Sequence, residues 1–358
     1  MEVRDRLAFK IMDDTGMLEE AYERLHRTGP EFRGWLSNHG PMAVESMVRR
    51  GHTGEIHRWL DTYMDRLEEL PSGTWPITDD DWREALGDAR RLGDWLNFFE
   101  TELKRWPWRA VLETWWPRLL PGIAAGATHG VIRTGHAVRE LLSREDEMRL
   151  AELGQALGYW AARWQGVAGT AAPSGTAGPA SALDGVPRVQ DQSQGINHRL
   201  AQLADTPGWT ESVAGLRPAD GAEQARERLI EVANAATLRY LTHAHGEPVM
   251  LIHSATAPTA VLRTLPALPT TLWGPSLDAA WAASAAVVAA YGPAEPAARE
   301  ELPAAPEREE AFDRAVRHGD EHAIKFADTA LDVYDRTGDA DALAGVIRAV
   351  DFIEPMPI

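Results

Sequence analysis

The chain contains no cysteine. This absence excludes disulfide bonds, iron–sulfur clusters, thiolate zinc sites and cysteine nucleophiles, so His, Asp, Glu and Lys are the side chains left to bind a metal. The chain also lacks a basic tract, and its 36 basic residues stand against 54 acidic ones, giving a formal net charge of −18. Because phosphate backbones are bound by basic surfaces, we expect no nucleic-acid partner.

Long apolar runs and the sequence motifs of several enzyme classes are also missing. The longest apolar run, 279–291, is too short to span a bilayer, and the charged residues 1–6 differ from the apolar stretch of a signal peptide. We therefore expect no membrane association and a cytoplasmic location. The lack of GxGxxG after a strand, of a Walker loop, of HExxH and of GxSxG argues against nucleotide-dependent hydride transfer, kinase chemistry and serine hydrolysis.

Lysine is scarce. It occurs at Lys10, Lys104 and Lys325, and the other 33 basic residues are arginines. Since this chain uses Arg on its solvated helix faces, a lysine embedded among apolar residues, as Lys325 is, indicates a need for a primary amine. Unlike a guanidinium, an amine can lose its proton when it is desolvated.

Most of the chain carries apolar residues at helical spacing, and alternating runs are few. We predict an all-α fold with more than half of the residues helical. A Gly/Ala/Pro-rich flexible loop or linker, 167–193, separates an N-terminal helical half, 1–166, from a C-terminal helical half, 194–358. We expect both halves to form one structural domain with the site between them. The clearest predicted helices are 17–26, 41–50, 56–70, 81–103, 148–164, 222–241 and 277–291.

Histidines are placed in two kinds of surroundings. Those on ordinary amphipathic helices are expected to be solvated and structural, and they are His26, His52, His57 and His198. Others lie beside small or apolar residues, such as His39, which should stand at the entrance of the helix that Pro41 begins. His253 follows an apolar run, 249–252, where a neutral imidazole needs a metal, a carboxylate or a carbonyl as partner.

The segment 318–325 carries two potential ligands one helical turn apart. At about 100° per residue, Lys325 lies about 60° from His322 on one face, and His318 falls between them if the helix runs through Gly319. Small residues on this face leave room for an ion or a substrate. The alternative is a histidine packed at a helix edge, with Lys325 reaching solvent.

The segment 120–139 holds glycines at positions where a helix gains nothing from them. Each costs about 1 kcal/mol relative to Ala in a helix interior, so they argue for the close approach of another backbone, a cofactor or a ligand. If the segment is helical, His129, Arg133 and His136 share one face. The alternative is close helix packing, with the histidines bonded to backbone carbonyls. The glycines are Gly126, Gly130 and Gly135.

Four histidine-bearing segments of the chain are distinctive as whole runs: NHGPMA (38–43), ATHGVIRTGHA (127–137), LIH (251–253) and GDEHAIK (319–325). These runs resemble the signature segments of the questin oxidase-like family, and they fall along nearly the whole chain. The first two are the most specific, and residues 254–258 follow the family pattern more loosely.

The resemblance implies an oxidoreductase, an oxygenase that uses dioxygen for the oxidative ring opening (C–C cleavage) of an aromatic polyketide such as an anthraquinone, in Baeyer–Villiger-like chemistry. It implies non-haem iron, Fe(II), as cofactor, with NADPH left open as a second one. The expected partners are thus the polyketide and dioxygen, and no oligomeric state is predicted. The matching motifs assign the metal ligands to His39, His129, His253, His322 and a carboxylated Lys325.

A carboxylated Lys325 would explain why an amine is placed there. A neutral amine adds carbon dioxide to give a carbamate, an oxygen ligand that divalent metals favour, and a guanidinium cannot do so. Four imidazoles and the carbamate would leave an octahedral iron with one open position for dioxygen. We further hypothesise that His136 orients a ligand or takes a proton, and that Arg133 stabilises oxyanion charge.

Three alternatives stay open at this stage. The same ligands suit a metal-dependent hydrolase in which zinc activates water. An NADPH-dependent Baeyer–Villiger-type oxidation is a second enzymatic alternative. A helical scaffold with structural histidines is the third.

Overall fold

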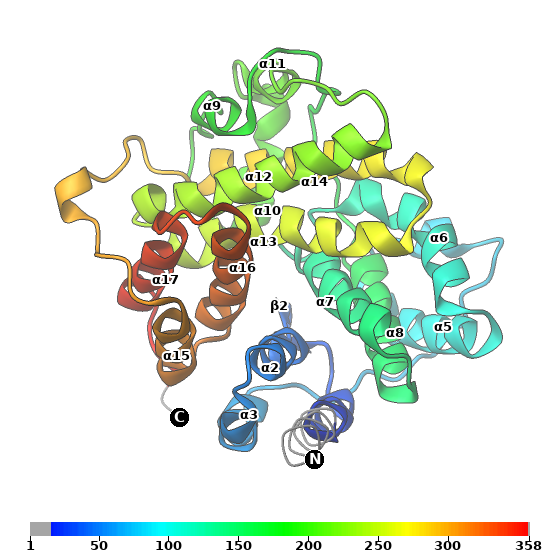
Figure 1. Cartoon of the computed structure of the whole chain (residues 1–358). Helices are drawn as coiled ribbons and strands as arrows, with labels where there is room; N and C mark the ends of the chain where they lie inside the picture. Colours follow the sequence, from blue (N-terminus) through cyan, green and yellow to red (C-terminus); the bar gives the residue numbers. More distant parts are fainter. Residues whose placement is uncertain (1–15, 357–358) are drawn as a thin grey trace.

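The structure, a computed structural model, describes residues 16–356 and is built almost entirely of helices (Figure 1). Helices hold 67% of the residues, which confirms the predicted all-α fold. Within residues 16–356, the sheet is limited to one antiparallel hairpin of two-residue strands, β1 (Glu31–Phe32) and β2 (Leu36–Ser37). Residues 1–6, on which the signal-peptide expectation rests, and Lys10 lie outside the described part of the chain.

The helices of the first half begin with residues 16–26. They continue with α2 (Gly40–Arg49), α3 (Ile56–Met64), α4 (Trp82–Ala85), α5 (Leu92–Arg105), α6 (Trp108–Leu119), α7 (His129–Ser143) and α8 (Glu147–Ala162). The 3-10 turns of this half are η1 (Thr53–Glu55), η2 (Ala89–Arg91) and η3 (Leu120–Gly122).

The helices of the second half are α9 (Pro179–Asp184), α10 (Ile196–Ala201), α11 (Trp209–Ala214), α12 (Ala222–His243), α13 (Pro248–Thr264), α14 (Trp273–Tyr291), α15 (Arg308–His318), α16 (Glu321–Thr337) and α17 (Asp341–Phe352). Its 3-10 turns are η4 (Leu203–Asp205), η5 (Leu265–Ala267), η6 (Thr270–Leu272) and η7 (Arg299–Glu301). Within the described residues, no helix combines the length and the apolar character needed to cross a membrane.

Two predicted helices end or break early in the structure, and the condition of a helix through Gly319 is not met. The prediction of one helix over 81–103 is wrong, because Leu86 is extended (ψ 131°) and Gly87 has a left-handed φ of +75°, so α4 ends there and α5 begins at Leu92. The helix predicted over 56–70 ends at Met64. The chain also does not run as one helix through Gly319, whose φ of +82° ends α15.

The break at Gly319 changes the position of His318. Its ring does not share the face of His322 and Lys325, and its Nε2 hydrogen-bonds the backbone carbonyl of Ile353 at 3.0 Å. A new helix, α16, begins two residues after the break, where the Asp320 carboxylate accepts hydrogen bonds from the backbone N–H groups of His322 and Ala323. A carboxylate in this capping position stabilises the first turn.

The segment 167–193 is largely irregular, as predicted, but it is packed against the helices of the second half. It contains α9, which contacts α12, and Leu183 is fully buried. The backbone N–H of Val189 also donates to the carbonyl of Ala289 in α14. Packing of this kind joins the segment to the C-terminal helices, and the division of the chain into two halves stays a prediction.

Four helices form a closed ring around the centre of the molecule. α2 contacts α7, α7 contacts α13, α13 contacts α16, and α16 contacts α2. Figure 1 shows α2 between α16 and α7, with α13 beyond it. Gly135 lets α7 approach α13 closely, because a Cβ atom at this glycine would lie 2.6 Å from the Cα of Ala260. The close backbone approach expected from the glycines is thus found at Gly135.

We predict that Gly135→Ala lowers the free energy of unfolding by about 1–3 kcal/mol, the usual cost of overpacking, because the added methyl group meets backbone that cannot turn aside. Gly274→Ala is the matched control, since Gly274 is also helical and has open space where its Cβ would lie. Urea unfolding of the two variants and the wild type measures the difference. If Gly135→Ala unfolds with the same free energy as the wild type, the tight contact between α7 and α13 is contradicted.

Candidate metal centre

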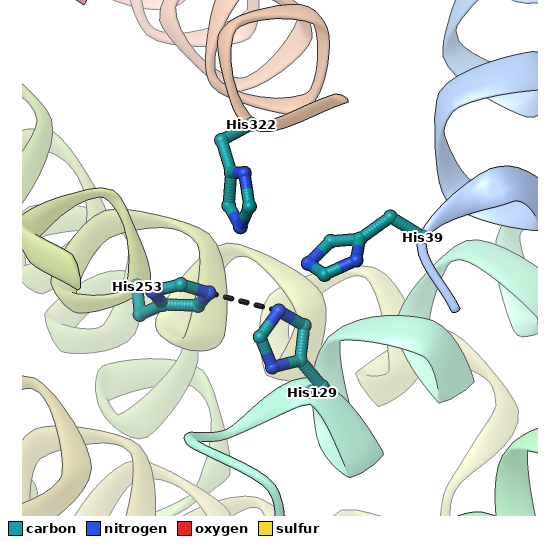
Figure 2. A group of neighbouring side chains, drawn as sticks. All are labelled: His39, His129, His253 and His322. Carbon is teal, nitrogen blue, oxygen red and sulfur yellow. Dashed lines mark hydrogen bonds between the residues drawn. The ribbon is translucent and has the colours of Figure 1, made fainter. Parts of the chain in front are cut away.

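Four histidines from four different helices converge on one point (Figure 2). Each offers a ring nitrogen, and the four nitrogens all lie within 4.8 Å of one another. Neighbouring rings are close, with centroids 4.3 Å apart for His39 and His129, 4.4 Å for His39 and His322, and 4.5 Å for His129 and His253. The structure thus brings together four residues that span almost 300 positions of the sequence, the set that the resemblance implied.

Each of these histidines lies near the N-terminal end of its helix. His39 caps α2, His129 opens α7, and His322 is the second residue of α16. His253 lies in the second turn of α13. The ring of four helices therefore directs the positive ends of its helix dipoles toward the histidines, which favours neutral imidazoles and any anionic group among them.

The rings of His129 and His253 have a defined orientation. The Nδ1 of His129 lies 2.5 Å from the carbonyl of Gly126, and the Nδ1 of His253 lies 3.1 Å from that of Met250. Because a carbonyl only accepts, both Nδ1 atoms must carry the proton, and both Nε2 atoms present lone pairs to the centre. These Nε2 atoms are 3.0 Å apart. Two facing lone pairs repel each other unless a cation lies between them.

Two further groups in the centre lack a partner. Both ring nitrogens of His39 and the amine of Lys325 are buried and have no hydrogen-bond partner among the described residues. Orphaned buried polar groups are costly, so several at one place indicate a ligand. A separation of ~3 Å between Nε2 atoms also suits two neighbouring ligands at ~2.1 Å from one ion. The donor set therefore fits a divalent metal.

A strained turn aims His129 at the centre. Gly126, Ala127 and Thr128 all have left-handed φ angles, of 53°, 59° and 68°. Side chains with a Cβ rarely adopt this conformation, which costs of order 1–3 kcal/mol for each residue. The turn lets the Gly126 carbonyl reach the ring of His129 three residues later. Strain of this kind is typical of functional sites, where the surrounding structure holds it in place.

The centre is electrostatically unfavourable for protonated histidine. Burial, and next the positive charge of Lys325, hold the pKa of His39 well below its usual range. Burial also lowers the pKa of Lys325 to about 7, against the opposing effect of Glu321 and Asp320. Neutral imidazole and neutral amine are the forms that bind metals or react with carbon dioxide.

A second cluster of charged residues joins the same four helices farther from their N-termini, and we call it the buried ionic network. The Asp328 carboxylate pairs with Arg139 at 2.9 Å and with Arg263 at 2.6 Å. Arg139 also pairs with Glu45, so one guanidinium connects α7 to both α2 and α16. The network consists of Glu45, Arg49, Arg50, His136, Arg139, Arg263, Asp328 and Asp332.

The buried ionic network includes three residues of metal-binding type, Glu45, His136 and Asp328. Guanidinium groups occupy the space between them, because Arg139 pairs with both carboxylates and Arg263 pairs with Asp328. Arginine is always protonated, so these positions already hold cations. The network is therefore a set of ion pairs that fixes the helices rather than a second metal centre.

The predicted catalytic residues lie apart from the histidine centre. The Nδ1 of His136 lies 2.6 Å from the Glu45 carboxylate, and Arg133 pairs with Glu152 at 2.6 Å. Neither is among the described residues that line the cavity beside the histidines. The roles assigned to them in the reaction therefore stay predictions, and the structure gives His136 a hydrogen bond to Glu45 and Arg133 an ion pair with Glu152.

A cavity of about 540 Å³ opens onto the histidines. All four line it, whereas Lys325 is not among its lining residues. The volume lies in the usual range for a small-molecule site. Its other walls come from the β1–β2 hairpin, from the first turn of α13 and from the end of α14. Apolar lining residues include Phe32, Trp35, Leu36, Ile196, Val249 and Met250.

Comparison with known protein families bears on this site. Residues 38–145 match the family model described as Questin oxidase-like. Over this stretch, about a third of its length, the chain is similar to that family. The matched stretch includes His39 and His129, and the family is the one that the signature segments suggested. No curated protein matches the chain.

The sequence did not lead us to the buried ionic network. Glu45 and Asp328 are fully buried, and each is a lone acidic residue within an apolar helical stretch, which is a signal of a buried charge. The sequence also gave no indication of Tyr63, whose hydroxyl accepts a 2.6 Å hydrogen bond from the backbone N–H of His39. This bond fixes the entrance of α2 from outside the histidine set.

We predict that acid weakens the fold through the buried side chains of His136 and Glu45. Burial lowers the pKa of His136 to about 4, and Arg139 and His136 outweigh burial to lower that of Glu45 to about 2. The unfolded chain therefore binds more protons than the folded one as the pH falls. The stabilisation is complete above about pH 6.5, declines toward pH 4 as unfolded His136 gains its proton, and declines further toward pH 2.

Melting temperatures between pH 7.5 and pH 4 measure this decline, and His136→Gln should make it shallower. His198→Gln is the control, because His198 is half exposed and pairs only with Asp191. The buried histidines of the centre add to the decline equally in all three proteins. An equal decline in the wild type and in His136→Gln would contradict the assignment.

Proposed function

We propose that this chain is a non-haem iron oxygenase that uses dioxygen to open a ring of an aromatic polyketide. The observation that carries the proposal is the convergence of four imidazoles, three of them buried, beside an unpartnered lysine amine. The family match supports the oxidase chemistry. Iron bound at this place would supply the activation of dioxygen.

The residues that would hold the iron are His39, His129, His253, His322 and Lys325. The carbonyls of Gly126 and Met250 keep the Nε2 atoms of two of these histidines free of protons, so the ligands need no deprotonation before the ion binds. Asp320 lies beside His322, with its Oδ1 3.4 Å from the ring Nδ1, but the two form no hydrogen bond in the structure. Burial of the set excludes bulk water from the reacting atoms.

Lys325 would contribute as a carbamate. Its amine is fully buried, and burial lowers its pKa to about 7, so a large fraction of the amine is neutral at physiological pH and its Nζ lone pair can attack carbon dioxide. A bond forms between Nζ and the carbon, the nitrogen gives up a proton, and the product is an anionic oxygen ligand. The convergent helix N-termini favour this negative charge.

The cavity suits an aromatic substrate. Its apolar walls can bury a planar ring system, and its opening at the histidines places one end of that system beside the candidate metal. Arg163 is the one guanidinium among the described lining residues, and Glu31 neutralises it at 2.5 Å. Strongly anionic substrates such as phosphate esters therefore find no free cation in the wall.

Metal content of anaerobically purified protein, followed by dioxygen uptake with a hydroxylated anthraquinone, tests the proposal. We expect about one iron per chain and substrate-dependent oxygen uptake. His322→Ala should lower iron occupancy severalfold, because it removes a ligand, whereas His57→Ala should not, because His57 is half exposed on α3.

Three results would contradict the proposal, and each would favour a different alternative. Zinc in the purified protein, with hydrolysis of an ester or amide and no oxygen uptake, would favour the metal-dependent hydrolase. Metal-free protein whose melting temperature does not change on adding iron or a chelator would favour the helical scaffold. A strict requirement for NADPH with oxygen uptake would instead favour the Baeyer–Villiger-type oxidation.

We predict that Lys325→Arg is as damaging as Lys325→Ala. A guanidinium stays protonated and cannot form a carbamate, so retaining the charge should not retain iron or turnover. Formate or acetate should partly restore iron binding to Lys325→Ala by supplying the missing oxygen ligand, and removing bicarbonate should weaken the wild type. Full iron content and turnover in Lys325→Arg would contradict the carbamate.

A further inference from the structure

We infer that Trp35 is the residue that recognises the fused ring system of the substrate, by stacking its indole on it at the mouth of the cavity. The inference rests on the proposed function for the substrate class. It goes beyond that function in assigning recognition to one side chain of the β1–β2 hairpin. Two features of the structure carry it, the exposure of Trp35 and the fixation of its backbone.

Trp35 is unusual among the exposed apolar residues. Its side chain is 54% exposed, although it lines the same cavity as the four histidines. The other large exposed apolar residues of the described chain lie elsewhere, and they are Leu70, Trp75, Trp106, Leu142 and Phe352. Because the histidines are nearly buried, this difference in exposure places Trp35 at the solvent side of the cavity and the histidines at its inner side. An exposed indole at the mouth of an apolar cavity is typical of a ligand contact.

The hairpin holds the backbone of Trp35 in place from two sides. The backbone N–H of Gly34 donates to the Glu68 carboxylate at 2.5 Å, and the guanidinium of Arg163 donates to the carbonyl of Gly34 at 3.2 Å. Arg163 also forms two hydrogen bonds with Glu31, of 2.5 and 2.7 Å. A side chain presented by a fixed backbone loses little freedom when it binds, so its contact adds to affinity.

The same hairpin leads directly to the candidate metal. Its second strand ends at Ser37, and His39 follows two residues later. The recognition surface and one candidate ligand thus belong to one short stretch, 35–39. We expect a single-ring phenol to fit within the inner part of the cavity and a fused three-ring system to extend toward Trp35. Stacking on Trp35 therefore selects for the fused system.

Binding of two probes under anaerobic conditions, 1,8-dihydroxyanthraquinone and phenol, tests this inference by equilibrium dialysis with the full chain. Trp35→Ala should raise the Kd for the anthraquinone about tenfold and leave that for phenol within about twofold. Trp35→Phe should recover most of the affinity. Trp75→Ala is the matched control, because Trp75 is 69% exposed and lines a different pocket. Iron content should be equal in all four proteins.

Three outcomes would overturn the inference. They are an unchanged anthraquinone Kd in Trp35→Ala, an equal loss for both probes, and a loss of iron in Trp35→Ala, which would make the hairpin a support for His39. A wild type that binds neither probe would overturn the substrate class as well. Anthraquinone binding that depends on Trp35, in a protein that consumes no oxygen, would support the inference while contradicting the proposed oxygenase.

Discussion

The structure depends on one constraint, the convergence of four helix N-termini on four histidines. Imidazoles packed in a buried group, with two lone pairs 3.0 Å apart, do not stabilise one another. They stay together because the ring of α2, α7, α13 and α16 is held elsewhere. The buried ionic network connects these same four helices, and Arg139 alone reaches both Glu45 of α2 and Asp328 of α16. Breaking one partner of such a pair leaves a buried charge, which is strongly destabilising.

Each of the four helices therefore carries candidate ligands near one end and ion pairs farther along. The N-terminal ends carry the histidines and an environment that favours neutral or anionic groups, whereas positions two to three turns later carry the ion pairs. This separation keeps arginines away from the centre, where a fixed positive charge would oppose metal binding. It also accounts for His136, which belongs to the ionic network although it lies on the same helix as His129.

Much of the fold and of the site was predictable from the sequence. Apolar residues at helical spacing predicted the all-α fold, and Pro41 predicted where α2 begins. The break at Gly87 was missed and the one at Gly319 was left open, because helical periodicity continues across a single glycine whose left-handed φ depends on its surroundings. The resemblance named the four histidines that meet in space. The spacing of residues along the chain could not identify them, because the four histidines meet only through the long-range packing of four helices.

Other features could not be read from single segments. Ala127 and Thr128 give no local indication of a left-handed turn, which the packing around His129 imposes. Glu45 and Asp328 were readable as lone acids in apolar helices, but their arginine partners lie up to 279 positions away. Trp35 appeared as one aromatic among 14 tryptophans, and only its exposure beside the cavity distinguishes it.

X-ray absorption at the iron edge of the anaerobically reconstituted protein tests the central claim most directly, because it counts the imidazoles that bind one ion. The account predicts one iron per chain with about four imidazoles at ~2.0–2.2 Å and additional oxygen scattering. If the His39→Ala variant shows one imidazole fewer at the iron, His39 is one of the ligands. Iron bound by two imidazoles or fewer, or no stoichiometric binding at all, would contradict the convergence of the four histidines on a single metal.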